Sequence, residues 1–188
     1  MNADLFELDL RDLPLAPGAV VLGGFARPLE GPLLAALQGI GEAAPFRHMV
    51  TPRGQPMSVA MTNCGTAGWV SDRTGYRYDT SDPESGREWP PMPAVFRDLA
   101  VQAAGRNEQD LEAPIVSVSL GLPAVFLFGG VRRADPTRRV RLTHGDVVVW
   151  GGAARLRYHG VLPLREGQHP LMGGHRINLT FRRAVCRG

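Results

Sequence analysis

The spacing of apolar residues predicts two helices in the first part of the chain. In residues 28–38 four leucines recur at the spacing of one helical face, although a Gly-Pro pair obscures the point where this helix starts. In residues 93–104 a Phe, a Leu and two Ala share one face, and Gly105 follows as the expected C-cap. We therefore expect one helix in each of these two ranges.

The segment between the predicted helices, residues 71–92, is rich in Asp, Ser, Gly, Pro and Arg and is typical of a long loop or lid. Four aromatic residues flank or interrupt it, namely Trp69, Tyr76, Tyr78 and Trp89. Aromatic side chains in a polar loop either stack on flat ligands such as nucleobases or pin the loop to the domain. The sequence pattern leaves both interpretations open.

Short β-prone runs replace the helical pattern after Gly105. They lie at residues 115–120, 124–128, 139–143 and 147–150. Several strands at roughly ten-residue spacing with glycine turns predict a β-sandwich or jelly roll. Helices from the N-terminal half would cover one face of the sheets, so the predicted class is α+β, mainly β.

The length and composition favour a single globular domain over residues 1–188. Apolar residues make up 44% of the 188 positions and charged residues 21%. No apolar run approaches the roughly 18 residues of a membrane span, and the first ten residues are acidic where a signal peptide is basic. We expect a soluble, cytoplasmic protein. Cys64 and Cys186 are isolated, which supports neither a zinc site nor a disulfide scaffold.

The charge is divided unevenly along the chain. All 21 basic residues are Arg; residues 1–105 have a net charge of −4 and residues 106–188 a net charge of +7. Because Arg binds phosphate and carboxylate groups in a bidentate geometry, a basic half indicates a polyanion or small anionic ligands. The alternative is a GC-rich coding bias that places Arg where Lys would otherwise occur on a solvated surface.

Residues 176–182 form the most informative predicted strand. Alternation places Arg176, Asn178, Thr180 and Arg182 on one face and three apolar residues on the other. If the polar face lines a pocket, its two guanidinium groups need anionic partners, and a dicarboxylate co-substrate would suit them. If it does not, the segment is a solvent-facing edge strand.

His159 is the other candidate for chemistry, shortly after a predicted strand and a Gly-Gly turn. A lone histidine is either a packed, hydrogen-bonded residue or a metal ligand. A non-heme iron site with two histidines and one carboxylate needs a His-x-Asp or His-x-Glu pair. The one such spacing in the sequence is His144-Gly145-Asp146, which we expect to form a turn.

Several ordered segments together resemble the AlkB family of iron(II)- and 2-oxoglutarate-dependent dioxygenases, in its bacterial alkylation-repair branch. The segments are residues 57–65 (MSVAMTNCG), 113–121 (APIVSVSLG), 144–152 (HGDVVVWGG), 158–160 (YHG) and 176–182 (RINLTFR). The resemblance extends with gaps from about residue 13 to residue 184. It implies a double-stranded β-helix, or jelly roll, in residues 106–188 with N-terminal helices and a nucleotide-recognition lid in about residues 45–92.

The resemblance assigns roles to individual residues. His159 matches a metal-binding histidine, Arg176 and Arg182 match the arginines that hold the carboxylates of 2-oxoglutarate, and Asn178 matches an asparagine that contacts the same co-substrate.

Four further residues match positions that contact nucleic acid. Trp69 and Tyr76 match lid positions at the substrate base and its backbone, and Arg133 matches a basic residue near the bound strand. Asn107 lies where some relatives have an Asp that helps to read the lesion base.

The function that the resemblance implies is oxidative demethylation of N-alkylated bases in DNA, of the 1-methyladenine and 3-methylcytosine type. The cofactors would be Fe(II) and 2-oxoglutarate. The expected partner is alkylated DNA, single-stranded or locally opened, with RNA as an alternative, and the protein is expected to be a monomer without a membrane partner.

One departure from the family pattern concerns the metal. In the family, a β-hairpin ending in His-x-Asp follows the helix that matches residues 93–105, and this chain continues directly into Arg106. Three explanations remain: an internal segment has been deleted or lost, the chain is a non-catalytic relative, or other residues rebuild the site. The nearest substitute ligands are Glu108, Asp110 and His144.

Overall fold

The computed structural model describes residues 11–106 and 113–184 of the chain. These residues divide between two compact units, one formed by Met1–Glu30 with Leu99–Arg183 and the other by Gly31–Asp98 with Ala184–Gly188. Within the described part of the chain, no helix is both long enough and apolar enough to cross a membrane.

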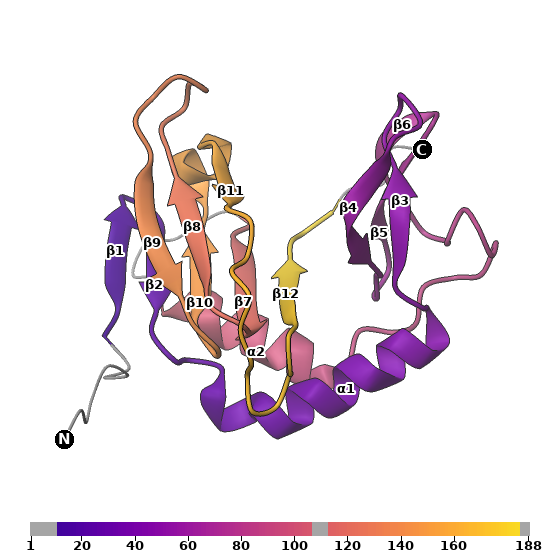
Figure 1. Ribbon diagram of the computed structural model, residues 1–188, viewed down its shortest axis with the longest axis horizontal. Helices are drawn as coiled ribbons and strands as arrows, with labels where there is room; N and C mark the ends of the chain where they lie inside the picture. Colours follow the sequence, from indigo (N-terminus) through magenta and orange to yellow (C-terminus); the bar gives the residue numbers. More distant parts are fainter. Residues whose placement is uncertain (1–10, 107–112, 185–188) are drawn as a thin grey trace. The chain divides into compact units, whose positions relative to one another are not determined.

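The first unit contains a five-stranded antiparallel sheet in the order β1-β2-β10-β7-β12 (Figure 1). Its strands are β1 (Leu13–Ala16), β2 (Ala19–Leu22), β7 (Ile115–Gly121), β10 (Val147–Trp150) and β12 (Arg176–Phe181). The central strands β7 and β10 are buried at every position, as expected for continuous apolar runs.

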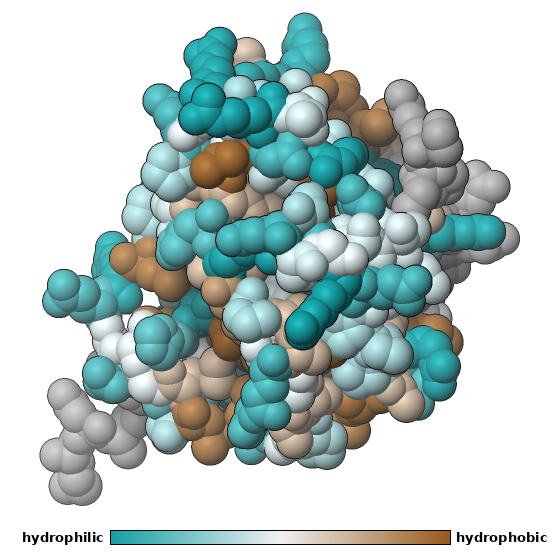
Figure 2. All heavy atoms as spheres, turned by 90° about the vertical axis from the view of Figure 1, so that its right-hand side faces the viewer, coloured by the Kyte–Doolittle hydropathy of each residue, from teal (hydrophilic) through white to brown (hydrophobic). Residues whose placement is uncertain are grey.

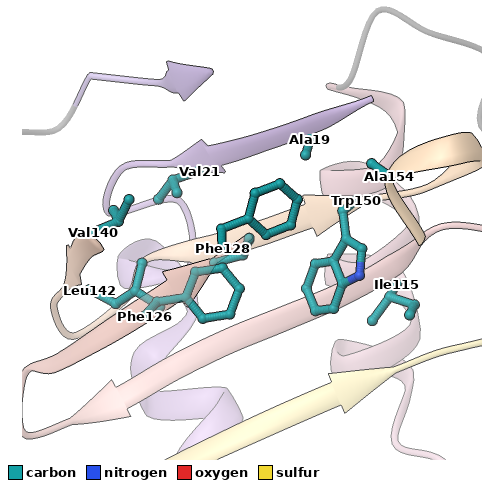
Figure 3. Packing of buried hydrophobic residues seen from close by; sticks show 10 residues of the cluster. Ala19, Val21, Ile115, Phe126, Phe128, Val140, Leu142, Trp150 and Ala154 are labelled. Atoms are coloured by element: carbon teal, nitrogen blue, oxygen red, sulfur yellow. The ribbon is translucent and has the colours of Figure 1, made fainter. Parts of the chain in front are cut away.

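A second, three-stranded sheet of the same unit has the order β11-β8-β9. It is formed by β8 (Ala124–Phe128), β9 (Arg138–Leu142) and β11 (His159–Val161), and the 3-10 helix η2 (Gly152–Leu156) precedes β11. Side chains of both sheets form one buried cluster, in which Phe126 and Phe128 of β8 lie near Trp150 of β10 (Figure 3). Two antiparallel sheets packed over a shared core confirm the predicted jelly roll.

The register defines which face of the large sheet is turned toward this core. Trp150 pairs with Ile115, and both belong to the shared cluster. Ser117 and Ser119 follow Ile115 at alternate positions, so they lie on the same inward face of β7. On β12 they pair with Thr180 and Asn178, which therefore face inward as well.

The predicted helices are present, with shifted ends. The first is η1 (Arg27–Leu29) followed by α1 (Glu30–Ala43), so it extends beyond the expected residue 38. The second, α2 (Ala94–Gly105), agrees with its expected range to within one residue at each end. Proline in the first turn of α1 is tolerated because the N–H groups there have no helical partner.

The second unit contains two β-hairpins, β3 (Arg47–Val50) with β4 (Pro56–Met61) and β5 (Gly68–Asp72) with β6 (Gly75–Asp79). The prediction of a loop over residues 71–92 was therefore wrong for β6. Apolar side chains between the hairpins include Met49, Val70 and Trp89. The molecular face in Figure 2 is mostly hydrophilic, with hydrophobic residues in small separate patches.

Polar contacts hold the segment after β6 in place. The Trp89 indole is buried and donates a 3.0 Å hydrogen bond to the Asp79 carbonyl. Arg47 forms a two-point ion pair with the buried carboxylate of Asp82, and its guanidinium lies 5.9 Å from the Trp89 ring centroid. Of the two interpretations of Trp89, the structure supports the one in which it pins the loop.

His144 stabilises the end of β7 in the first unit. Gly121 has φ +90°, a conformation that favours glycine, and its N–H donates a 2.9 Å hydrogen bond to His144 Nδ1. Because Nδ1 accepts, Nε2 carries the ring proton and donates to Glu30 Oε2 at 3.1 Å. Both ring nitrogens of His144 are therefore occupied.

Candidate functional site

A polar array lies on the inward face of the large sheet, where β7 and β12 pair. Arg176 Nη2 donates to Ser119 Oγ at 3.0 Å and to Asn178 Oδ1 at 3.1 Å. The Ser117 hydroxyl donates to the same Asn178 oxygen at 3.0 Å. Asn178 Nδ2 donates to Thr180 Oγ1 at 2.8 Å, which orients the amide. The neutral groups of this array satisfy one another, and none of them is a carboxylate that could balance the positive charge of Arg176.

The guanidinium of Arg176 is the unusual group of this array. Burial lowers the pKa of Arg176 below its ordinary value, because a buried charge is costly. Its Nε is buried and has no hydrogen-bond partner among the described residues, and none of their acidic side chains forms an ion pair with it. A half-buried guanidinium without an acidic partner favours binding of an anionic ligand, whose negative charge compensates its own.

His159 lies on the facing sheet and is also directed inward. It pairs directly with Phe128, a member of the shared core, and its ring lies 5.0 Å from the ring of Trp150. The Arg157 carbonyl lies 3.0 Å from His159 Nδ1, and a carbonyl can only accept, so Nδ1 carries the proton. Nε2 of the exposed imidazole is then left with a free lone pair, the form that binds metals.

A complete metal site does not accompany His159. In residues 11–106 and 113–184, no group of three or more His, Cys, Asp or Glu side chains is arranged to hold a metal ion. His144, one of the proposed substitute ligands, has both ring nitrogens in other hydrogen bonds. The other substitutes, Glu108 and Asp110, lie outside the described residues, as does Asn107.

The two remaining arginines of the predicted site are exposed. Arg182 follows the last residue of β12, and the alternation of that strand places it on the face of Arg176 and Asn178. Arg133 lies in the connection between β8 and β9. Neither of them forms an ion pair with another residue of the described part of the chain.

Trp69 and Tyr76 come together in the second unit. They lie on the same face of the β5–β6 hairpin, and their rings stack with centroids 5.7 Å apart and planes 16° apart. Asn63 fixes Trp69 by hydrogen bonds to both its N–H and its carbonyl. Tyr76 is 60% exposed, so one aromatic ring of the stacked pair is open to a flat ligand.

The sequence patterns missed three residues of the inward face. Ser117 and Ser119 hydrogen-bond the predicted pair Asn178 and Arg176, and Trp150 has a buried indole N–H that no described residue accepts. The two serines carried a signal, since they are polar residues at alternate positions of an otherwise apolar strand. The Trp150 N–H carried none, because a tryptophan in an apolar run is expected in the core.

The model of the 2OG-Fe(II) oxygenase superfamily matches this chain in two pieces, residues 18–109 and 104–182. The chain is 49% identical over 200 residues to the alpha-ketoglutarate-dependent dioxygenase AlkB of Salmonella typhimurium, with 92% of this chain and 93% of that protein covered. It is 38% identical over 88 residues to the DNA N(6)-methyladenine demethylase ALKBH1A of Arabidopsis thaliana, which covers 44% of this chain and 26% of that protein.

Among solved structures, OsALKBH1 is similar to this chain with a TM-score of 0.73 and 25% identity. The match covers 91% of this chain and all of that one. The two-sheet architecture of the first unit is thus shared with a known structure of the same fold.

The alignment with the Salmonella protein contains a gap in this chain. It spans 200 positions but includes 92% of 188 residues, about 173, so about 27 positions have no counterpart here. The two pieces of the superfamily match overlap at residues 104–109, where α2 ends.

Proposed function

Because this chain belongs to the 2OG-Fe(II) oxygenase superfamily and, within it, to the AlkB family, we propose that it serves the oxidative demethylation of N-alkylated bases in DNA. Lesions of the 1-methyladenine and 3-methylcytosine type are the proposed substrates. One molecule of O2 and one of 2-oxoglutarate are consumed, and formaldehyde, succinate and CO2 leave with the repaired base. Fe(II) and 2-oxoglutarate supply the oxidising chemistry when bound.

In this proposal the inward polar array holds 2-oxoglutarate. The single observation that supports it best is the half-buried guanidinium of Arg176, which has a partnerless Nε and no acidic partner in the described chain. Arg176 and Asn178 would bind one carboxylate, and Arg182 on the same face would bind the other. Ser119 would orient Arg176, and His159 would contribute its free Nε2 to the metal.

The second unit would recognise the nucleic acid. We assign the lid to about residues 45–92 and the jelly-roll core to residues 106–188 with the N-terminal strands, within one dioxygenase-like domain. Tyr76, stacked on Trp69, offers an exposed ring to an unstacked base. Arg133 would contact the phosphate backbone, and Asn107 the lesion base.

Single-stranded or locally opened DNA is the proposed form of the substrate, since a stacked duplex hides the methyl group. One plant relative is named a DNA N(6)-methyladenine demethylase and one yeast relative a tRNA demethylase, so RNA is kept as the alternative substrate. We further assign the protein to the cytoplasm, as a monomer.

The iron half of the site does not fit the described residues. Holding iron with open positions takes two histidines and a carboxylate, and His159 alone supplies one ligand. We expect the 188-residue chain to bind iron weakly and to turn over slowly.

A second candidate function is a binding protein without turnover, which holds nucleic acid or a dicarboxylate. Two observations favour it: the described residues contain no metal-ligand cluster, and about 27 positions of the alignment with the Salmonella protein have no counterpart in this chain. The same gap is expected if a segment of an active enzyme has been deleted from this chain.

One set of measurements separates these possibilities. The intact mass of the purified protein, compared with its coding sequence, shows whether the molecule has the 20.4 kDa of this chain or is larger. Iron content and formaldehyde release from a methylated oligonucleotide are then measured with and without 2-oxoglutarate. Stoichiometric iron with 2-oxoglutarate-dependent release supports the enzyme, whereas salt-sensitive binding of the oligonucleotide without release supports the binding protein.

A further inference from the structure

The inward face combines a well-formed anion site with an incomplete metal site. We infer that this chain binds four- and five-carbon dicarboxylates without a divalent metal ion, and that it binds succinate as tightly as 2-oxoglutarate. This inference rests on the 2-oxoglutarate site of the proposed function and adds a change in selectivity to it.

The Arg176 end of the site does not depend on a metal. The Arg176 guanidinium is fixed by Ser119 and Asn178 at 3.0 and 3.1 Å, so little side-chain entropy is lost when an anion binds. Burial without a carboxylate partner disfavours its charge in the free protein. An incoming carboxylate compensates this charge, and that gain is the same with and without a metal.

The opposite end offers a second cation rather than a metal. Arg182 lies six residues from Arg176 on the same face, roughly 20 Å away at full extension of a strand, and its long side chain shortens the span. Two arginines at the ends of one face select a ligand with two carboxylates over one with a single carboxylate.

The 2-oxo group is what distinguishes 2-oxoglutarate from succinate at this site. A metal ion held beside His159 would distinguish the two ligands by contacting the 2-oxo group. The described residues provide one imidazole there and no second or third metal ligand. The indole N–H of Trp150 is enclosed in the apolar cluster, with the residue 2% exposed, so it does not replace the metal. The 2-oxo group therefore adds no affinity.

Calorimetric titration of the full chain tests this inference. Protein treated with EDTA is titrated with 2-oxoglutarate, succinate and butyrate, and the series is repeated with Mn(II). We expect dissociation constants for the two dicarboxylates within threefold of each other, at least tenfold weaker binding of butyrate, and less than threefold change with Mn(II). Arg176→Gln should abolish binding, and Arg141→Gln, on the outward face of β9, should leave it unchanged.

Three results would overturn the inference: tenfold or tighter binding of 2-oxoglutarate than of succinate, a tenfold or larger gain with Mn(II), or no binding of either dicarboxylate by folded protein. Circular dichroism checks that each variant is folded. The outcomes are separable from those for the proposed function. Metal-dependent binding with formaldehyde release contradicts only this inference, whereas metal-free binding without release contradicts only turnover by this chain.

Discussion

Arg176 and Ser119 lie on neighbouring strands, and the Arg176 guanidinium donates a 3.0 Å hydrogen bond to the Ser119 hydroxyl. A small polar residue on the fully buried strand β7 thus sets the direction of the charged group on β12. Ser117 plays the same part for Asn178, whose amide oxygen accepts from both the serine and the arginine. The geometry of the proposed 2-oxoglutarate site therefore depends on the pairing of β7 with β12.

Replacing Ser119 by Ala is expected to weaken 2-oxoglutarate binding about three- to tenfold. The reason is the loss of one orienting hydrogen bond, a contribution of about 0.5–1.5 kcal/mol. Calorimetric titration measures it, with Ser58→Ala on the exposed strand β4 as the matched control. An affinity equal to that of the parent protein contradicts this role of Ser119.

The ion pair between Arg47 and Asp82 predicts acid sensitivity of the second unit. Burial by itself raises the pKa of Asp82, but hydrogen bonds from Arg47, the Glu84 N–H and the Ser85 hydroxyl outweigh it, and the pKa is lowered to about 2. As the pH falls, Asp82 of the unfolded chain is protonated near the ordinary Asp pKa of about 3.9, whereas Asp82 of the native protein is protonated only at lower pH. Stability is therefore present above about pH 4 and is lost as the pH falls toward 2.

Urea denaturation of the parent protein and of Asp82→Asn between pH 6 and pH 2.5 measures this contribution. We expect the variant to be less stable by about 1–3 kcal/mol at pH 6, with a difference that shrinks on acidification. Glu84→Gln is the control, since Glu84 contacts the same arginine at 3.0 Å but is exposed. A difference that does not vary with pH contradicts the assignment to the Asp82 carboxylate.

His144 is predicted to act as a positioning residue at neutral pH. Burial lowers its pKa, the nearby His169 ring adds to this effect, and the Glu30 carboxylate opposes it. The unfolded chain therefore binds a proton near pH 6.5 that the native state does not, so stability falls as the pH decreases below about 6.5. His144→Leu should flatten this dependence and cost about 1–3 kcal/mol, because the Gly121 N–H loses its acceptor.

Thermal denaturation between pH 8 and pH 5 measures both effects of His144→Leu. Titration with 2-oxoglutarate measures the positioning role. Gly121, at the end of β7, pairs with Arg176, so a shift of this end in His144→Leu would move Arg176 and weaken 2-oxoglutarate binding. His169→Leu is the control, since it removes the stacked ring but keeps both hydrogen bonds of His144. Unchanged 2-oxoglutarate affinity in folded His144→Leu would exclude the positioning role.

Tyr76→Ala is expected to weaken binding of single-stranded methylated oligonucleotides by about 1–3 kcal/mol, the range for one stacked base. The ring is 60% exposed, so unfolding stability should change by less than about 1 kcal/mol. Fluorescence anisotropy with a labelled oligonucleotide measures the binding. Val101→Ala, at an equally exposed apolar residue of α2, is the control, and equal losses in both variants would contradict a stacking role.

The jelly roll was predictable wherever apolar runs are continuous. Residues 124–128 and 147–150 form strands with the predicted ends, because glycines bound both runs. Strand β6 was missed because its sequence GYRYD is polar. Its Arg77 is paired with Asp72 and Asp79 at 2.8 and 3.2 Å, and these partners are defined only once the hairpin has formed.

The sequence predicts which site residues share one face of a strand, but it does not predict which residues they contact. Alternation put Arg176 and Asn178 on one face, but the direction of that face depends on the pairing of β12 with β7, which brings together residues about 60 positions apart. The buried state of His144 depends on Glu30, 114 residues away, and no local pattern encodes such a contact.

The central claim is that the Arg176 guanidinium, on the inward face of the large sheet, binds a dicarboxylate. The most direct measurement is the NMR signal of the Arg176 Nε–H group during titration with 2-oxoglutarate, assigned by its absence in Arg176→Lys. Because this Nε has no partner in the described chain, its signal should shift strongly. The Nε–H signal of Arg138, an exposed arginine whose Nη1 donates to the Pro14 carbonyl, should stay constant. An unchanged Arg176 signal at ligand saturation would contradict the account.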